Sequence, residues 1–215
     1  MPTVVSENAM KISRSGVLIA LGIVLLLSSA VLETVNMSTD RRAREKSEHI
    51  VNELRERITD VPADSSFPDI SDNYDNNADE EVREDFITVD DDRYCGILTI
   101  PAIGAELPVS YDYSYEQMSE SLCRYSGSLE TDDMIICGHN YRSFLQKLDR
   151  VNEGDSIFFT DHRGVSYEYA VNEIQLIGGY ELRELLEGGS DWDLSLFTCN
   201  YSGYYRYVLR CRALE

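Results

Sequence analysis

The 215-residue chain is long enough for one domain with tails, and 39 acidic against 19 basic side chains give it a formal charge of −20. Nucleic-acid binding needs a basic face, and because none is visible in the sequence we expect no nucleic-acid partner. Much of the charge lies in residues 60–92, which hold 13 acidic side chains and one basic side chain. This uneven distribution indicates a solvated segment between parts of different composition.

The first of these parts is an apolar segment near the N-terminus. The stretch GVLIALGIVLLLSSAVL, which begins at Gly16, has 17 residues without a charge, close to the shortest helix that crosses a hydrocarbon core of about 30 Å. We therefore expect a transmembrane anchor over residues 16–33. Lys11 and Arg14 favour a cytoplasmic segment over residues 1–15, which would place the rest of the chain on the extracellular face of the cell membrane. A cleaved signal peptide, ending near the small residues SSA, and a buried core helix are the alternatives.

Two polar segments follow the anchor. Residues 38–59 are highly charged but contain apolar residues near helical spacing, which predicts a helical stalk. These apolar residues are Ile50, Val51, Leu54 and Ile58. Residues 60–92 contain few apolar residues, two prolines and dense acid, which is typical of a disordered linker. We therefore expect the folded domain to begin at residue 93.

From residue 93 to residue 215, short runs of alternating apolar and polar residues predict β-strands. The runs expected as strands are YCGILTI, AELPVS, MIICGH, the hairpin DSIFFTDHRGVSYEYAVNEIQLI, WDLSLFTC and YRYVLRCRAL. Ser114 and Gln117 form a capping-box pattern that predicts a short helix in SYEQMSESLCRY, and NYRSFLQKL predicts a further helical turn. We expect a mainly β fold, a closed or nearly closed barrel of about eight strands with one or two short helices, because closure removes the sheet edges.

One pair of residues lies where the last two predicted strands meet. Cys199 ends one strand and Arg206 begins the next, so antiparallel pairing would place them side by side. A guanidinium there favours the thiolate and can stabilise an oxyanion. A cysteine nucleophile also needs a proton carrier, for which histidine is suited. Of the three histidines, His49 lies in the stalk and His162 in a hairpin turn, so His139, at the end of a predicted strand, is the candidate.

The cysteine pattern is consistent with a reactive thiol. There are five cysteines, an odd number, so at least one is unpaired within the chain. They form no C-x-x-C pair, so we expect no structural zinc site. Cys137 and Cys211 could form a disulfide if their strands were neighbours. The alternative interpretation is that these cysteines are small core residues of a non-catalytic β-barrel interaction module.

The residues SLFTC at 195–199, followed by Arg206, resemble the sortase signature T-L-x-T-C with an arginine at the start of the next strand. Ser195 replaces the first threonine of that motif. Three further pieces occur in the family's order, and the resemblance covers residues 94–215. They are GILTIP at 96–101, LPV at 107–109 and ICGH at 136–139.

The resemblance implies an eight-stranded barrel with cysteine transpeptidase activity, anchored in the membrane of a Gram-positive cell. Cys199 would attack the carbonyl of an LPxTG-like sorting signal in a surface protein or pilin. His139 would protonate the leaving amine, and Arg206 would hold the substrate and its oxyanion. The thioester would pass to an amine of a cell-wall precursor or a pilin lysine. An enzyme that mainly hydrolyses its substrate is the alternative.

Three residues near the hairpin are expected at the substrate. Thr198 matches the motif threonine, and Tyr201 and Tyr204 belong to a cluster of tyrosines that can form an aromatic wall. In the sortase family, the connection that corresponds to residues 178–193 largely shapes the substrate groove. Here this connection is short, so the sorting motif stays open. The subclass, class B-like or divergent, stays open with it.

We expect no cofactor and no metal, with calcium as the alternative, because some sortases bind calcium near this connection. The acidic residues that could supply oxygen ligands are Glu130, Asp132, Asp133, Glu181 and Glu184.

Overall fold

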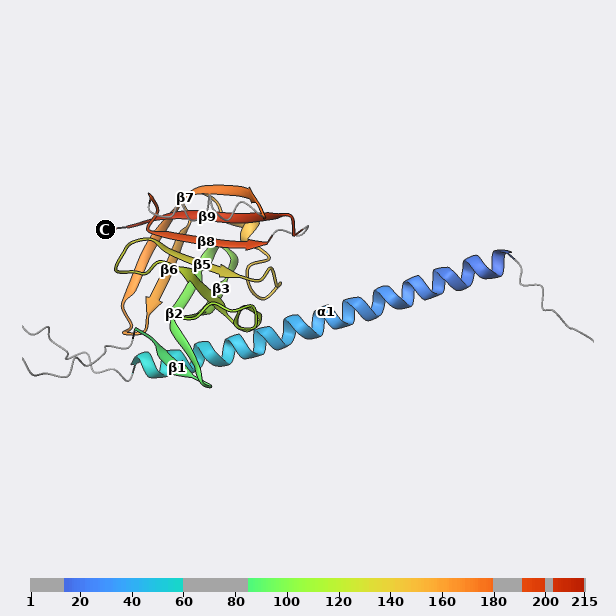
Figure 1. The fold of residues 1–215 in the computed structure, drawn as a ribbon, viewed down its shortest axis with the longest axis horizontal. Coiled ribbons are helices and arrows are strands. Elements are labelled where there is room, and N and C mark those ends of the chain that lie inside the picture. The colour runs from blue at the N-terminus through green and yellow to red at the C-terminus, as the bar shows by residue number, and fades with distance from the viewer. Residues whose placement is uncertain (1–13, 60–84, 180–190, 200–202, 215) are drawn as a thin grey trace, which may run out of the picture. The chain divides into compact units, whose positions relative to one another are not determined.

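The computed structural model describes residues 14–59, 85–179, 191–199 and 203–214 (Figure 1). The chain divides into two compact units, with the boundary between Thr39 and Asp40. The elements in chain order are α1 (Arg14–Thr59), β1 (Ile87–Val89), β2 (Asp92–Ile100), η1 (Pro101–Ile103), β3 (Ala105–Ser110), η2 (Gln117–Ser119), β4 (Leu122–Ser126), β5 (Met134–Gly138), η3 (Leu148–Arg150), β6 (Ser156–Asp161), β7 (Ser166–Gly178), β8 (Leu194–Cys199) and β9 (Tyr205–Ala213), where η marks a single 3-10 turn.

One continuous helix replaces the two helices that we expected over residues 16–33 and 38–59. α1 runs for 46 residues, because neither glycine nor proline interrupts the sequence between these segments. Its residues 15–39 are all exposed and largely apolar. By length and composition, α1 is therefore a candidate membrane span.

The barrel is closed by eight strands. Their order is β2-β3-β4-β5-β8-β9-β7-β6, and β6 pairs back with β2 (Figure 1). The pairs β3–β4 and β5–β8 are parallel, whereas the other neighbours are antiparallel. The predicted mainly β, eight-stranded barrel is confirmed. Its interior holds buried apolar side chains from every barrel strand, among them Leu98, Val109, Leu122, Ile136, Phe159, Val171, Leu196 and Leu209.

The folded part begins earlier than residue 93. β1 pairs with β2 outside the closed barrel, and it lies in the segment that we expected to be a linker. The apolar residue Val89 is buried, which explains why this end of the acidic segment is ordered. Residues 60–84 of the predicted linker lie outside the described residues.

The second half of α1 packs on β1 and β2. Side chains of the predicted apolar stripe form a buried cluster with residues of these two strands, so residues 40–59 belong to the same compact unit as the barrel. The cluster contains Ile50, Val51, Leu54, Val89, Tyr94 and Ile97.

The predicted short helices are single 3-10 turns. The Gln117 N–H donates to Ser114 Oγ at 2.9 Å, as the capping-box pattern predicts, but the helix ends after η2. The residues that follow form β4, a strand that the sequence did not indicate, because pairing with β3 and β5 satisfies their backbone groups. NYRSFLQKL forms turns that lead into η3.

Candidate active site

Strand register brings the three predicted catalytic residues to one end of the barrel. β5 and β8 are parallel and pair Gly138 with Thr198. The residues that follow this pair in the sequence are His139 and Cys199. β8 and β9 are antiparallel and pair Cys199 with Arg206, as the sequence predicted. The three residues therefore occupy neighbouring positions at the ends of three adjacent strands.

The face on which Cys199 lies follows from strand alternation. Phe197 belongs to a buried cluster with Val208 of β9 and Cys137 of β5, whereas Leu196 faces the barrel interior. Because Cys199 is two residues after Phe197, it lies on the outer face of the barrel. A substrate can reach this face without entering the barrel core.

Burial distinguishes Cys199 from the other four cysteines. Cys199 is partly exposed, and all the others are buried. Burial raises the pKa of Cys95 and Cys211 to about 12, that of Cys123 to about 11, and that of Cys137 still further. Because the thiolate is the reactive form, these four thiols are poor nucleophiles.

None of the five thiols is in a disulfide. The pairing that we considered, Cys137 with Cys211, is excluded by the strand order. Cys137 lies opposite Cys123 on β4, whereas Cys211 lies opposite Leu194 and Val171.

Two aromatic rings contact the imidazole of His139. The Tyr115 ring meets it edge-on, with centroids 5.1 Å apart and an interplanar angle of 83°. The Tyr141 ring lies 5.0 Å away at an angle of 34°. Burial of His139 lowers its pKa, because the charged imidazolium loses solvation. Neither tyrosine was predicted at the site.

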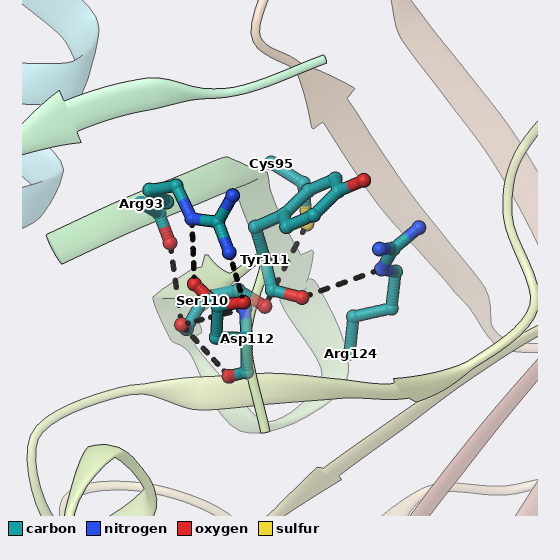
Figure 2. Close-up of polar contacts among 6 residues, drawn as sticks. All are labelled: Arg93, Cys95, Ser110, Tyr111, Asp112 and Arg124. Carbon is teal, nitrogen blue, oxygen red and sulfur yellow. Dashed lines mark hydrogen bonds and ion pairs between the residues drawn. The ribbon is translucent and has the colours of Figure 1, made fainter. Parts of the chain in front are cut away.

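The connection that carries Tyr115 is fixed where it leaves β3, as Figure 2 shows. Arg93 donates from Nε to Asp112 Oδ2 at 2.8 Å. The Ser110 hydroxyl hydrogen-bonds to the Asp112 carbonyl at 2.9 Å. The ring of Tyr111 lies between two guanidinium groups, with Arg124 Cζ 3.9 Å from its centroid. These contacts set the direction in which the connection runs toward His139.

The same connection also supplies Tyr113. Its ring packs edge-on against Tyr125, with centroids 5.1 Å apart, and Tyr125 packs against Phe197 at 5.4 Å. Burial raises the pKa of Tyr113, and the charge of Arg206 opposes this shift. Through Tyr125, the Tyr113 ring is linked to Phe197 of β8, two residues before Cys199. The alternating tyrosines of YDYSY, at 111–115, were a sequence signal that could have indicated aromatic rings near the site.

The β8–β9 hairpin orients Arg206. Its Nη1 donates to the Gly203 carbonyl at 3.1 Å. Tyr204, a predicted substrate contact, is 74% exposed beside it. Tyr201, the other predicted tyrosine, lies outside the described residues.

Thr198, a predicted substrate contact, makes a hydrogen bond within the fold. It is buried, and its hydroxyl donates to the Gly138 carbonyl at 2.9 Å. This bond joins β8 to β5 immediately before Cys199 and His139. In the structure the hydroxyl therefore contacts the neighbouring strand, where it helps to hold the two catalytic candidates in register.

The residues expected as calcium ligands divide between two places. Glu130, Asp132 and Asp133 lie in the β4–β5 connection, and Glu181 and Glu184 lie outside the described residues. Asp133 Oδ1 accepts a hydrogen bond from the Ser128 N–H at 3.2 Å, and a hydrogen bond from Ser128 lowers the pKa of Glu130. In residues 14–59, 85–179, 191–199 and 203–214, no group of three or more His, Cys, Asp or Glu side chains could hold a metal ion. The absence of a metal stays a prediction, with calcium as its alternative.

A sequence model of the sortase domain matches residues 98–214, more than half of the chain. The chain belongs to the sortase family. Among curated proteins, no relative matches its sequence. Sortases are cysteine transpeptidases, and the residues placed together here are those that the sortase resemblance indicated.

Solved sortases have similar folds at low sequence identity. Sortase C1 from Streptococcus agalactiae is 23% identical, with a TM-score of 0.50 over 60% of this chain and 71% of that chain. The Sortase D5 transpeptidase of Clostridium perfringens is 17% identical, with a TM-score of 0.49 over 57% of this chain and 79% of that one. Sortase C1 of GBS Pilus Island 1 is 18% identical at a TM-score of 0.47, over 56% of this chain and only 64% of that chain. The first of these similarities, at a TM-score of 0.50, concerns the fold.

We expect Tyr115→Ala to raise the pKa of His139 toward the ordinary value of about 6.5, because it removes part of the burial that lowers it. Tyr115 is 76% exposed, so the substitution should not disturb folding. An NMR titration of the imidazole, assigned with His139→Asn, measures the pKa. Tyr113→Ala is the matched control, because the Tyr113 ring contacts Tyr125. An unchanged pKa in Tyr115→Ala, or an equal rise in both variants, would contradict the prediction.

Proposed function

We propose that this sortase is a membrane-anchored transpeptidase that cleaves LPxTG-like sorting signals through Cys199. The observation that supports this most directly is the register of β5, β8 and β9, which aligns His139, Cys199 and Arg206. The exposure of Cys199, in contrast to the burial of the other thiols, also supports the assignment.

The proposed reaction has two steps. The Cys199 thiolate attacks the peptide carbonyl, and the resulting oxyanion is stabilised by Arg206. The tetrahedral intermediate collapses to a thioester, and the leaving amine takes a proton from His139. An amine of a cell-wall precursor or of a pilin lysine then attacks the thioester and gives its proton back to His139. A new amide is formed, Cys199 leaves as the thiolate, and His139 is protonated again.

The exposed aromatic rings around these groups can provide a surface for an extended peptide. The Tyr115 ring contacts His139, and Tyr204 lies in the β8–β9 hairpin. Tyr113 packs on Tyr125, which in turn contacts Phe197 of β8. All three expose half or more of their surface. Aromatic rings bind the apolar side chains of a sorting signal with little loss of conformational entropy. The apolar half of α1 would hold the enzyme in the membrane, with the barrel on the extracellular face.

A peptide-transfer assay tests this function. The full chain in detergent micelles is incubated with a library of Leu-Pro-x-Thr-Gly-like peptides, with and without an amine nucleophile, and products are identified by mass spectrometry. We expect cleavage between Thr and Gly and a transfer product when the amine is present. Hydrolysis alone in the presence of saturating amine would favour the hydrolase alternative. Cleavage of no peptide would favour a non-catalytic interaction module.

A further inference from the structure

A contact between α1 and the segment after His139 has no role in the proposed reaction steps. The backbone N–H and the hydroxyl of Ser143 both donate to Asp40 Oδ1, at 2.9 Å each. The two residues are 103 positions apart in the sequence. A carboxylate that accepts two hydrogen bonds makes a strong, directional contact.

From residue 15 onward, Asp40 is the first residue of α1 that is partly buried. Residues 15–39 before it are exposed, and the residues after it on the same face are buried. These are Ala43, Ser47, Ile50 and Leu54. Aspartate is unfavourable inside a helix, and the nearby Arg44 bonds Glu48 at 2.7 Å. Within the helix, the charge of Asp40 also favours the Arg44 guanidinium. The printed hydrogen bonds to the Asp40 carboxylate come from Ser143.

Ser143 lies in a turn that reaches back to the imidazole. The Tyr141 carbonyl accepts hydrogen bonds from the N–H groups of Phe144 and Gln146, both at 3.0 Å. Phe144 is buried in the main core, and the Tyr141 ring packs 5.6 Å from it. The Tyr141 ring also packs against His139, with ring centroids 5.0 Å apart. A continuous series of contacts thus joins Asp40 to the imidazole.

We propose that Asp40 is a positioning residue for His139. By holding Ser143, it fixes the turn that keeps Tyr141 against the imidazole, so the second half of α1 is part of the catalytic unit. Asp40 acts through this turn and not on the substrate. The inference rests on the proposed role of His139 as proton carrier.

Steady-state kinetics of peptide cleavage by the full chain in detergent micelles tests the inference. We expect Asp40→Ala to lower kcat about tenfold and to leave KM within about twofold, because misplacing a proton carrier slows chemistry without weakening substrate binding. Asp40→Asn keeps an acceptor oxygen and should restore most of kcat. Glu45→Gln is the matched control, since it removes a carboxylate from the same helix at a side chain that is 60% exposed.

A double-mutant cycle shows whether the contact between Asp40 and Ser143 itself accounts for the loss of kcat. Ser143→Ala loses the hydroxyl bond but keeps the backbone N–H bond, so its loss should be smaller than that of Asp40→Ala. The double variant should be little slower than Asp40→Ala alone, because the first change already breaks both bonds to the carboxylate. It leaves the Ser143 hydroxyl only a 3.4 Å contact with the backbone carbonyl of residue 40. The inference would be overturned if the kcat losses of the two single variants multiplied in the double variant. It would also be overturned if Asp40→Ala were as fast as Glu45→Gln.

Hydrogen exchange provides a readout that is independent of peptide cleavage. Asp40→Ala should speed amide exchange in residues 139–147 and leave exchange in β2 unchanged. If the wild-type enzyme cleaves no peptide, the proposed function fails, and the exchange experiment still tests the positioning contact. Unchanged exchange in residues 139–147 would overturn it.

Discussion

Cys199→Ala should abolish peptide cleavage, with a loss on the order of 10⁴-fold or more, because no other group can form the thioester. The other thiols cannot replace it. All four are buried, and burial raises the pKa of each of them, so little thiolate is present at neutral pH. The thermal unfolding temperature should change little, since Cys199 is partly exposed at a strand end.

Thiol labelling supplies the control for this result. In the native enzyme iodoacetamide should label Cys199 much faster than the buried thiols, which should react fully only after unfolding. Mass spectrometry of tryptic peptides identifies the labelled residue. Equal labelling rates for all five thiols, or residual cleavage in Cys199→Ala, would remove Cys199 from its assigned role.

The sequence predicts the Cys199–Arg206 pair because that pair is local. Two alternating runs joined by a loop that contains Gly203 predict a hairpin, and a hairpin fixes its own register. The position of His139 depends instead on the parallel pairing of β5 with β8. No local pattern specifies such long-range pairing, so the sequence could place His139 only at the end of a strand.

The parts that the sequence did not predict all depend on tertiary contacts. β4 forms where a capping pattern favours a helix, because two neighbouring strands pair with it. β1 forms in an acidic segment because Val89 is buried beside α1. The rings of Tyr115 and Tyr141 come from different segments, and only the folded chain brings both to His139.

Arg206→Ala should lower kcat/KM for peptide cleavage by about 10²- to 10³-fold, as expected for loss of an oxyanion donor. Most of the loss should be in kcat, because the oxyanion exists only after attack by Cys199. Arg206→Lys should recover only part of the activity. A lysine keeps the charge but lacks the planar set of donors that Arg206 directs from its position beside Gly203.

The matched control for this prediction lies on the same strand. Arg212 is near the far end of β9, paired with Asp193 and stacked on Trp192. Arg212→Ala removes one guanidinium from β9 without touching the end that holds Cys199, so its kcat/KM should stay within about twofold of wild type. Equal losses in the two variants would mean that the enzyme needs the charge of β9 in general. A loss confined to Arg206 would mean that catalysis depends on a guanidinium opposite Cys199, which the strand register provides.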